Sequence, residues 1–191
     1  FSEIMFLLLS GCGVGYSVQK HHVAQLPPLI GPNNKHHKYL IGDSIIGWAD
    51  AVKTLIKAYF NGKAMPVFDY RDIRPKGSLL ITSGGKAPGP EPLRDGLHNI
   101  QKILERALSD RGRNTQLKTI EAHDICCYIA DCVLSGGIRR AACLSLFSFD
   151  DTDMLECKFG NWWETNPQRA RSNNSVALLR HKVKRKDYQF L

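Results

Sequence analysis

Residues 119–149 decide the fold class and read TIEAHDICCYIADCVLSGGIRRAACLSLFSF. The first half predicts a helix from about Ile120 to Leu134, because apolar residues recur there at steps of four. Thr119 would cap this helix and Gly136-Gly137 would end it. The apolar and aromatic run from Leu144 to Phe149 then predicts a strand. A helix that leads into a strand through a glycine-rich loop is typical of α/β folds.

Two more amphipathic helices are predicted upstream. The helix from about Pro92 to Leu108 carries a stripe of apolar residues that we expect to be buried. The helix over residues 43–60, capped by Asp43 or Ser44, has a narrower apolar seam, which favours packing against one partner helix. The residues expected to face inward are Leu93, Leu97, Ile100, Leu104, Leu108, Ile45, Trp48, Val52, Leu55, Tyr59, Ile125, Ile129 and Val133.

Further strand-like runs alternate with these helices, at residues 16–18, 67–70, 79–82 and 175–179. This alternation predicts an α/β fold whose sheet is at least partly parallel. Residues 20–42 contain prolines and two His-His doublets among lysines, so we expect an exposed loop there and no metal site.

Composition limits the class of protein. Of the 191 residues, 43% are hydrophobic, which is enough to form a core, yet no apolar run is long enough to span a membrane. The formal net charge of +8 favours anionic partners. The six cysteines show no Cys-x-x-Cys spacing, so we expect free thiols in a reducing, cytoplasmic setting. The chain begins and ends inside apolar patterns, so we expect an internal piece of a larger protein.

Four loops could carry chemistry, and each has a plain structural alternative. The glycine turn at residues 10–15 could approach a ligand closely or could simply turn the chain. Residues 82–90 could hold an anion before a helix or form an ordinary loop. The arginines of residues 135–142 suit phosphate or base edges, or a structural ion pair. Asn173 and Asn174 could line a pocket or belong to a turn.

Taken in order, the chain resembles the large chain of adenosylcobalamin-dependent (class II) ribonucleotide reductases. The matching stretches cover most of the sequence: SGCGVGYSV at 10–18, DIRPKG at 72–77, SGGKAPGPEPL at 83–93, SGGIRRA at 135–141, NWWETNPQR at 161–169 and SNNSVA at 172–177. The resemblance implies a ten-stranded α/β barrel, of which residues 1–191 would supply about the first half. It also implies adenosylcobalamin as cofactor, a thiyl-radical mechanism, and reduction of ribonucleoside triphosphates or diphosphates to 2′-deoxyribonucleotides.

The resemblance also implies roles for individual residues. Cys12, Gly13, Val14 and Gly15 would lie beside the substrate ribose. Gly136, Gly137, Ile138, Arg139, Arg140 and Ala141 would form the loop that relays the identity of a deoxynucleotide effector to the substrate. Arg74 and Lys76 would bind the effector, and the helix over 43–60 would frame its site. The resemblance also implies a thioredoxin-like reductant as a partner. It implies neither binding to a membrane nor direct binding to nucleic acid.

The family's radical cysteine lies in an Asn-Pro-Cys-x-Glu motif that this sequence does not contain. We therefore expect the catalytic cysteines to lie outside this chain, and the chain alone to be inactive. Two rival interpretations remain at this point. One is a reductase that uses a different radical generator. The other is a basic nucleic-acid- or nucleotide-binding module without catalysis, which would use Arg139, Arg140 and the tail at 181–186.

Overall fold

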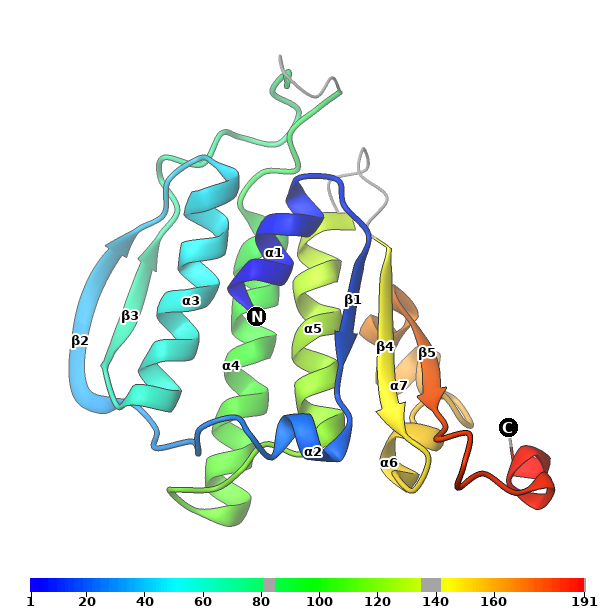
Figure 1. The fold of residues 1–191 in the computed structure, drawn as a ribbon. Coiled ribbons are helices and arrows are strands. Elements are labelled where there is room, and N and C mark those ends of the chain that lie inside the picture. The colour runs from blue at the N-terminus through cyan, green and yellow to red at the C-terminus, as the bar shows by residue number, and fades with distance from the viewer. Residues whose placement is uncertain (81–84, 135–141, 191) are drawn as a thin grey trace.

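The computed structural model describes residues 1–80, 85–134 and 142–190. In chain order the elements are α1 (Ser2–Leu9), β1 (Val14–Ser17), α2 (Lys20–Val23), β2 (Asn33–Leu40), α3 (Ile45–Asn61), β3 (Ala64–Asp69), α4 (Glu91–Arg111), α5 (Thr119–Leu134), β4 (Cys143–Ser148), α6 (Thr152–Leu155), α7 (Trp162–Thr165), β5 (Ser172–Ala177) and two 3-10 helices, η1 (Pro167–Arg171) and η2 (Arg185–Phe190). Helices and parallel strands alternate along most of the chain, which confirms the α/β class (Figure 1).

The main sheet has the strand order β1-β4-β5, and every pairing is parallel. Val14 pairs with Cys143, and Cys143 in turn pairs with Ser172. Side chains of β4 alternate between buried and exposed, because one face of the sheet lies against α5. Parallel strands usually have both faces covered, so a sheet with only one covered face is unusual.

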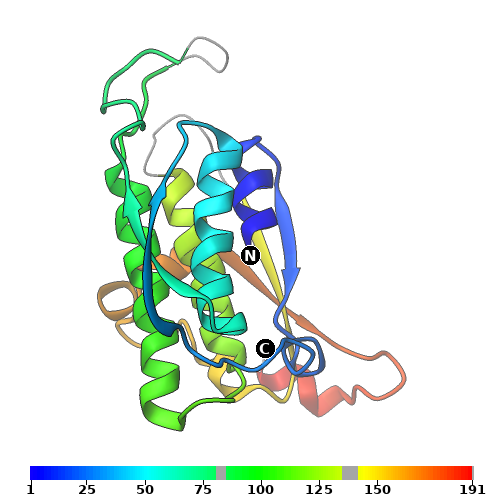
Figure 2. The ribbon, with the colours of Figure 1, turned by 90° about the vertical axis from the view of Figure 1, so that its left-hand side faces the viewer.

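Helices α1, α3, α4 and α5 enclose the core beside this sheet (Figures 1 and 2). α5 begins at Thr119, so the predicted cap is the first helical residue, and Glu121 accepts a hydrogen bond from the Lys118 N–H (2.8 Å). The predicted inward residues of α5 are all buried, as are those of α4 except Leu108, which is partly buried. Close packing of α4 on α5 depends on Gly96, since a Cβ there would lie 2.0 Å from Cys132 Sγ.

Two expectations for residues 20–61 were wrong. Residues 20–42 are not all loop, because they contain α2 and the strand β2, which pairs in parallel with β3. Nearly all side chains of β2 are nevertheless exposed, as expected. α3 does not pack on a single partner, because it contacts α1, α4 and β3. Buried alanines such as Ala51 and Ala58 widen its apolar face beyond the predicted seam.

The strand expected at 79–82 is described only as far as residue 80, where Leu79 forms an isolated antiparallel bridge with Lys86. The N-terminus of α3 is capped by Ser44, as the sequence allowed: its side chain accepts a hydrogen bond from the Gly47 N–H (2.9 Å). Among the described residues, no helix is long and apolar enough to cross a bilayer.

Candidate functional site

The glycine turn lies where α1 ends and β1 begins, next to the start of β4 (Figure 1). The Val14 N–H donates to the Ala142 carbonyl (2.8 Å), and a Cβ on Gly13 would lie 3.8 Å from that same carbonyl oxygen. The residues predicted to form the specificity loop, 136–141, immediately precede Ala142 and lie outside the described residues. The structure therefore places the glycine turn against Ala142, the residue that follows that segment in the sequence.

Gly15, Leu144 and Asn173 stand side by side on the face of the sheet that points away from α5. A Cβ added to Gly15 would meet no atom within 4 Å. Leu144 and Leu146 are 40% and 38% exposed on this face, although both are apolar. We call this surface of β1, β4 and β5 the open face. On the open face, Gly15 and Asn173 flank the exposed apolar side chain of Leu144.

The two candidate asparagines have different surroundings. Asn174 points toward the covered side, where its Oδ1 accepts from Ser145 Oγ (3.0 Å) and its Nδ2 donates to Cys157 Sγ (3.1 Å). Asn173 is exposed on the open face. Only Asn173 is therefore placed to meet a ligand beside Gly15.

All six cysteines are free thiols, as predicted, and only Cys12 is exposed. Burial raises the pKa of Cys127 and Cys132 to about 12 and that of Cys143 to about 11. These buried thiols are uncharged at neutral pH and thus poor nucleophiles. Cys12, in the glycine turn, is the accessible thiol.

Behind the open face lies a buried polar cluster that sequence reasoning missed. The Tyr16 hydroxyl lies 3.0 Å from His123 Nδ1 and 3.2 Å from Ser172 Oγ. His123 Nε2 lies 3.5 Å from Cys127 Sγ. Burial lowers the pKa of His123 to about 4, an effect that Arg169 and Lys158 reinforce and Asp124 opposes. The imidazole is therefore neutral at pH 7.

A second buried group joins α5 to η1. Arg169 donates to both carboxylate oxygens of Asp124 (2.8 Å each) and to the Cys157 carbonyl (2.8 Å). Gln168 Nε2 also donates to Asp124 (3.1 Å). Such a bidentate, charge-assisted pair fixes the orientation of both partners. The sequence signal is the polar pair His123-Asp124, which interrupts the apolar residues of the buried part of α5.

The predicted effector residues lie near the N-terminus of α3. Arg74 Nε donates to Asp43 Oδ2 (2.5 Å), which ties the segment after β3 to the start of α3. Lys76 is exposed, and the next residues pair with 85–87 through backbone hydrogen bonds, including Gly77 N–H to Ala87 O (2.9 Å). Arg74 is therefore already paired with a carboxylate. An incoming phosphate would have to compete with Asp43 for the Arg74 guanidinium.

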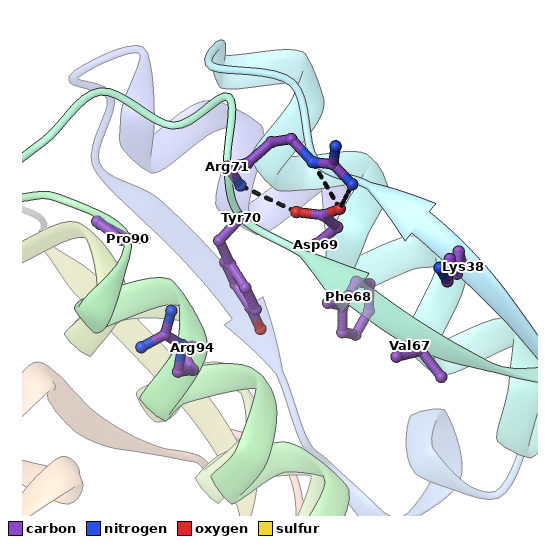
Figure 3. Close-up of a pocket in the computed structure, with 8 residues that line it drawn as sticks. All are labelled: Lys38, Val67, Phe68, Asp69, Tyr70, Arg71, Pro90 and Arg94. Atoms are coloured by element: carbon purple, nitrogen blue, oxygen red, sulfur yellow. Dashed lines mark hydrogen bonds and ion pairs between the residues drawn. The ribbon is translucent and has the colours of Figure 1, made fainter.

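An open pocket of about 470 Å³ lies between the end of β3 and the start of α4 (Figure 3). Its cationic residues are Lys38, Arg71 and Arg94. Arg71 is bonded to Asp69, and the Arg94 guanidinium lies 4.8 Å from the centre of the Tyr70 ring. Burial raises the pKa of Tyr70 to about 12. None of the predicted site residues lines this pocket.

The family model described as the insertion domain of B12-dependent ribonucleotide reductase matches residues 17–104. An adenosylcobalamin-dependent ribonucleoside-triphosphate reductase of Euglena gracilis is 34% identical over 92% of this chain and 24% of its own length. The protein of the same name from Lactobacillus leichmannii is 30% identical over 93% of this chain and 28% of its own. A crystal structure of a B12-dependent (class II) ribonucleotide reductase matches 93% of this chain and 28% of its own, with a TM-score of 0.76 and 25% identity. Over more than nine-tenths of its length, the chain is similar to class II ribonucleotide reductases in sequence and in fold.

The chain spans about a quarter of the length of these class II reductases. The segment that matches the insertion domain runs from the end of β1 into α4, so it includes β2, α3 and β3. Strands β4 and β5, which carry most of the open face, lie outside that segment. The matched segment and the main sheet therefore overlap only at Ser17, the last residue of β1.

Proposed function

We propose that this protein takes part in the adenosylcobalamin-dependent reduction of ribonucleoside triphosphates to 2′-deoxyribonucleotides. The observation that carries the proposal is the match to class II reductases in both sequence and fold over more than nine-tenths of the chain. The relatives' names specify triphosphates, which favours them over diphosphates. The same matches do not favour a nucleic-acid-binding module.

The open face is the proposed substrate surface. Cys12, Gly13, Val14 and Gly15 would lie beside the ribose, because a turn rich in glycine allows the backbone to come within hydrogen-bonding distance of a sugar. Asn173 would supply an amide on the other side of Leu144. In the complete protein the remaining strands of a ten-stranded barrel would continue this sheet at its edges and close around the open face, which would then line the barrel interior, with residues 1–191 forming about the first half of the barrel. This arrangement explains why two leucines are left exposed in a parallel sheet.

Arg74 and Lys76 are the proposed effector residues. Both belong to the segment between β3 and α4, and this segment begins at the same end of the molecule as the turn between α1 and β1 (Figure 1). The Arg74–Asp43 pair couples this segment to α3, so an effector phosphate that draws Arg74 away from Asp43 would change the start of α3. Residues 136–141 would relay this change to the substrate, because they lead into Ala142 beside the glycine turn.

We assign no step of the reaction to adenosylcobalamin on the described residues, which contain no group of three or more His, Cys, Asp and Glu side chains placed to hold a metal ion of their own. The sequence contains no Asn-Pro-Cys-x-Glu motif, so the radical cysteine would come from elsewhere in the complete protein. Two further cysteines would supply the reducing electrons, and a thioredoxin-like cytoplasmic dithiol would re-reduce the disulfide that they form. The chain alone is expected to be inactive.

The substrate surface is tested by Gly15→Val in the complete protein. Valine suits a strand, and a Cβ at position 15 meets no atom within 4 Å, so the fold should be retained. The side chain would occupy the proposed ribose site, and we expect kcat/KM for ribonucleoside triphosphates to fall by at least about ten-fold. Gly15→Ala provides the graded control and should lose less. A Gly15→Val protein with unchanged kcat/KM would show that the open face does not bind substrate.

A further inference from the structure

The Tyr16 side chain links two strands that are not neighbours. β1 and β5 are separated by β4, and adjacent strands lie about 4.8 Å apart, so the outer two are roughly 10 Å apart. The Tyr16 hydroxyl nevertheless reaches to within 3.2 Å of Ser172 Oγ. The residues of β4 between them, Cys143 and Ser145, are small and buried, which leaves room for the ring to cross. Tyr16 therefore spans the covered face of the sheet.

Helix α5 also contacts the Tyr16 hydroxyl, through His123. His123 Nδ1 lies 3.0 Å from it, and His123 is completely buried. Ser172 is fixed in turn, because its carbonyl accepts a hydrogen bond from Lys158 Nζ (2.5 Å). One phenol group thus joins β1, β5 and α5 in a largely buried region, where an unpaired polar group would be costly.

Each strand residue of this cluster is the chain neighbour of a residue on the open face. Tyr16 follows Gly15, and Ser172 precedes Asn173. Successive side chains of a strand point to opposite faces, so fixing Tyr16 and Ser172 on one face fixes Gly15 and Asn173 on the other. Gly15 and Asn173 both pair with Leu144, one from each side.

We propose that Tyr16, His123 and Ser172 are positioning residues that set the separation and orientation of Gly15 and Asn173 on the open face. This inference rests on the proposed function, in which that face binds the ribonucleotide. Without the hydroxyl bridge, β1 and β5 would be held together mainly through their separate ladders with β4. A displacement of the order of 1 Å at such a surface is enough to reduce turnover substantially.

The test uses Tyr16→Phe and Ser172→Ala, singly and together, in the complete protein. Both substitutions keep the packing but remove the bridge. We expect each single variant to lower kcat/KM for a ribonucleoside triphosphate roughly 5- to 50-fold, mainly through a higher KM. The double variant should lose no more than the worse single one, because both remove the same bridge. Ser172→Ala also serves if Tyr16→Phe does not fold.

Tyr59→Phe is the matched control. It also removes a buried tyrosine hydroxyl, which donates to Glu105 Oε1 (3.1 Å). Tyr59 lies near the C-terminal end of α3, outside the sheet that carries the open face. Tyr59→Phe should lower stability without changing KM. If Tyr16→Phe and Ser172→Ala behave like Tyr59→Phe, the positioning role is wrong while the reductase function stands. If the parent protein reduces no ribonucleotide, the proposed function fails and this inference fails with it.

Discussion

At the scale of single residues, the buried groups behind the sheet matter as much as the exposed loop residues. His123 is the clearest example, because a neutral imidazole in the interior resists protonation. Its neighbours are a phenol, a thiol, the Asp124–Arg169 pair and Lys158. The cations Arg169 and Lys158 add to the effect of burial, whereas Asp124 acts against it.

This environment predicts a loss of stability in acid. In the unfolded chain His123 would bind a proton near pH 6.5, whereas in the fold its pKa is about 4. Below pH 6.5 the unfolded state therefore gains protons first, and the free energy of unfolding should fall between pH 6.5 and 4 by up to roughly 3 kcal/mol. His123→Gln should flatten this part of the curve, measured by urea unfolding at several pH values. An equally steep curve in the variant would assign the loss to other groups.

Sequence reasoning found the exposed part of the candidate site but not its support. Gly15 of the glycine turn and Asn173 lie on one surface, and both were recognised from local motifs. The contacts of Tyr16 with His123 and Ser172 join residues 107 and 156 positions apart in the chain. No local pattern encodes such contacts, and His123 lies on an apolar helix face that periodicity alone interprets as core.

At the scale of elements, the long helices were predictable and the second sheet was not. α4 and α5 each carry an apolar stripe whose period is a local property of the sequence. β2 reads Asn-Asn-Lys-His-His-Lys-Tyr-Leu, a polar run without strand alternation, and its structure depends on pairing with β3 across α3. That pairing is a long-range property, which explains why an exposed loop was expected there.

The close contact between α4 and α5 predicts whether Gly96→Ala raises or lowers the stability of the protein. In an unobstructed helix, Gly→Ala stabilises by up to about 1 kcal/mol. At Gly96 the new Cβ would lie 2.0 Å from Cys132 Sγ, so we expect Gly96→Ala to destabilise the protein by roughly 1–3 kcal/mol. Adding Cys132→Ala removes the clashing sulfur and should recover most of the loss in urea unfolding. Stabilisation by Gly96→Ala alone would show that the helices are less closely packed.

At the scale of the whole molecule, the open face is the feature that most needs explanation. Leu144 and Leu146 expose apolar surface on a parallel sheet that ordinarily has two covered faces. The match to about a quarter of each relative's length fits a sheet that continues into further strands. The free edges of β1 and β5 would then be pairing edges.

The chain expressed by itself should therefore associate or aggregate and should bind a dye specific for exposed apolar surface. Leu144→Lys together with Leu146→Lys, on the open face, should reduce both effects without lowering the unfolding temperature greatly. Analytical ultracentrifugation and dye fluorescence measure the two quantities. A monodisperse monomer that binds no dye and melts cooperatively would show that the open face needs no cover.

The central claim is that this protein takes part in ribonucleotide reduction, and product formation tests it most directly. The measurement is the formation of 2′-deoxyribonucleotide from a ribonucleoside triphosphate by the complete protein and a dithiol reductant, with and without adenosylcobalamin. We predict product only when the cofactor is present. A folded complete protein that forms no deoxyribonucleotide under these conditions, or forms it equally without adenosylcobalamin, would contradict the claim.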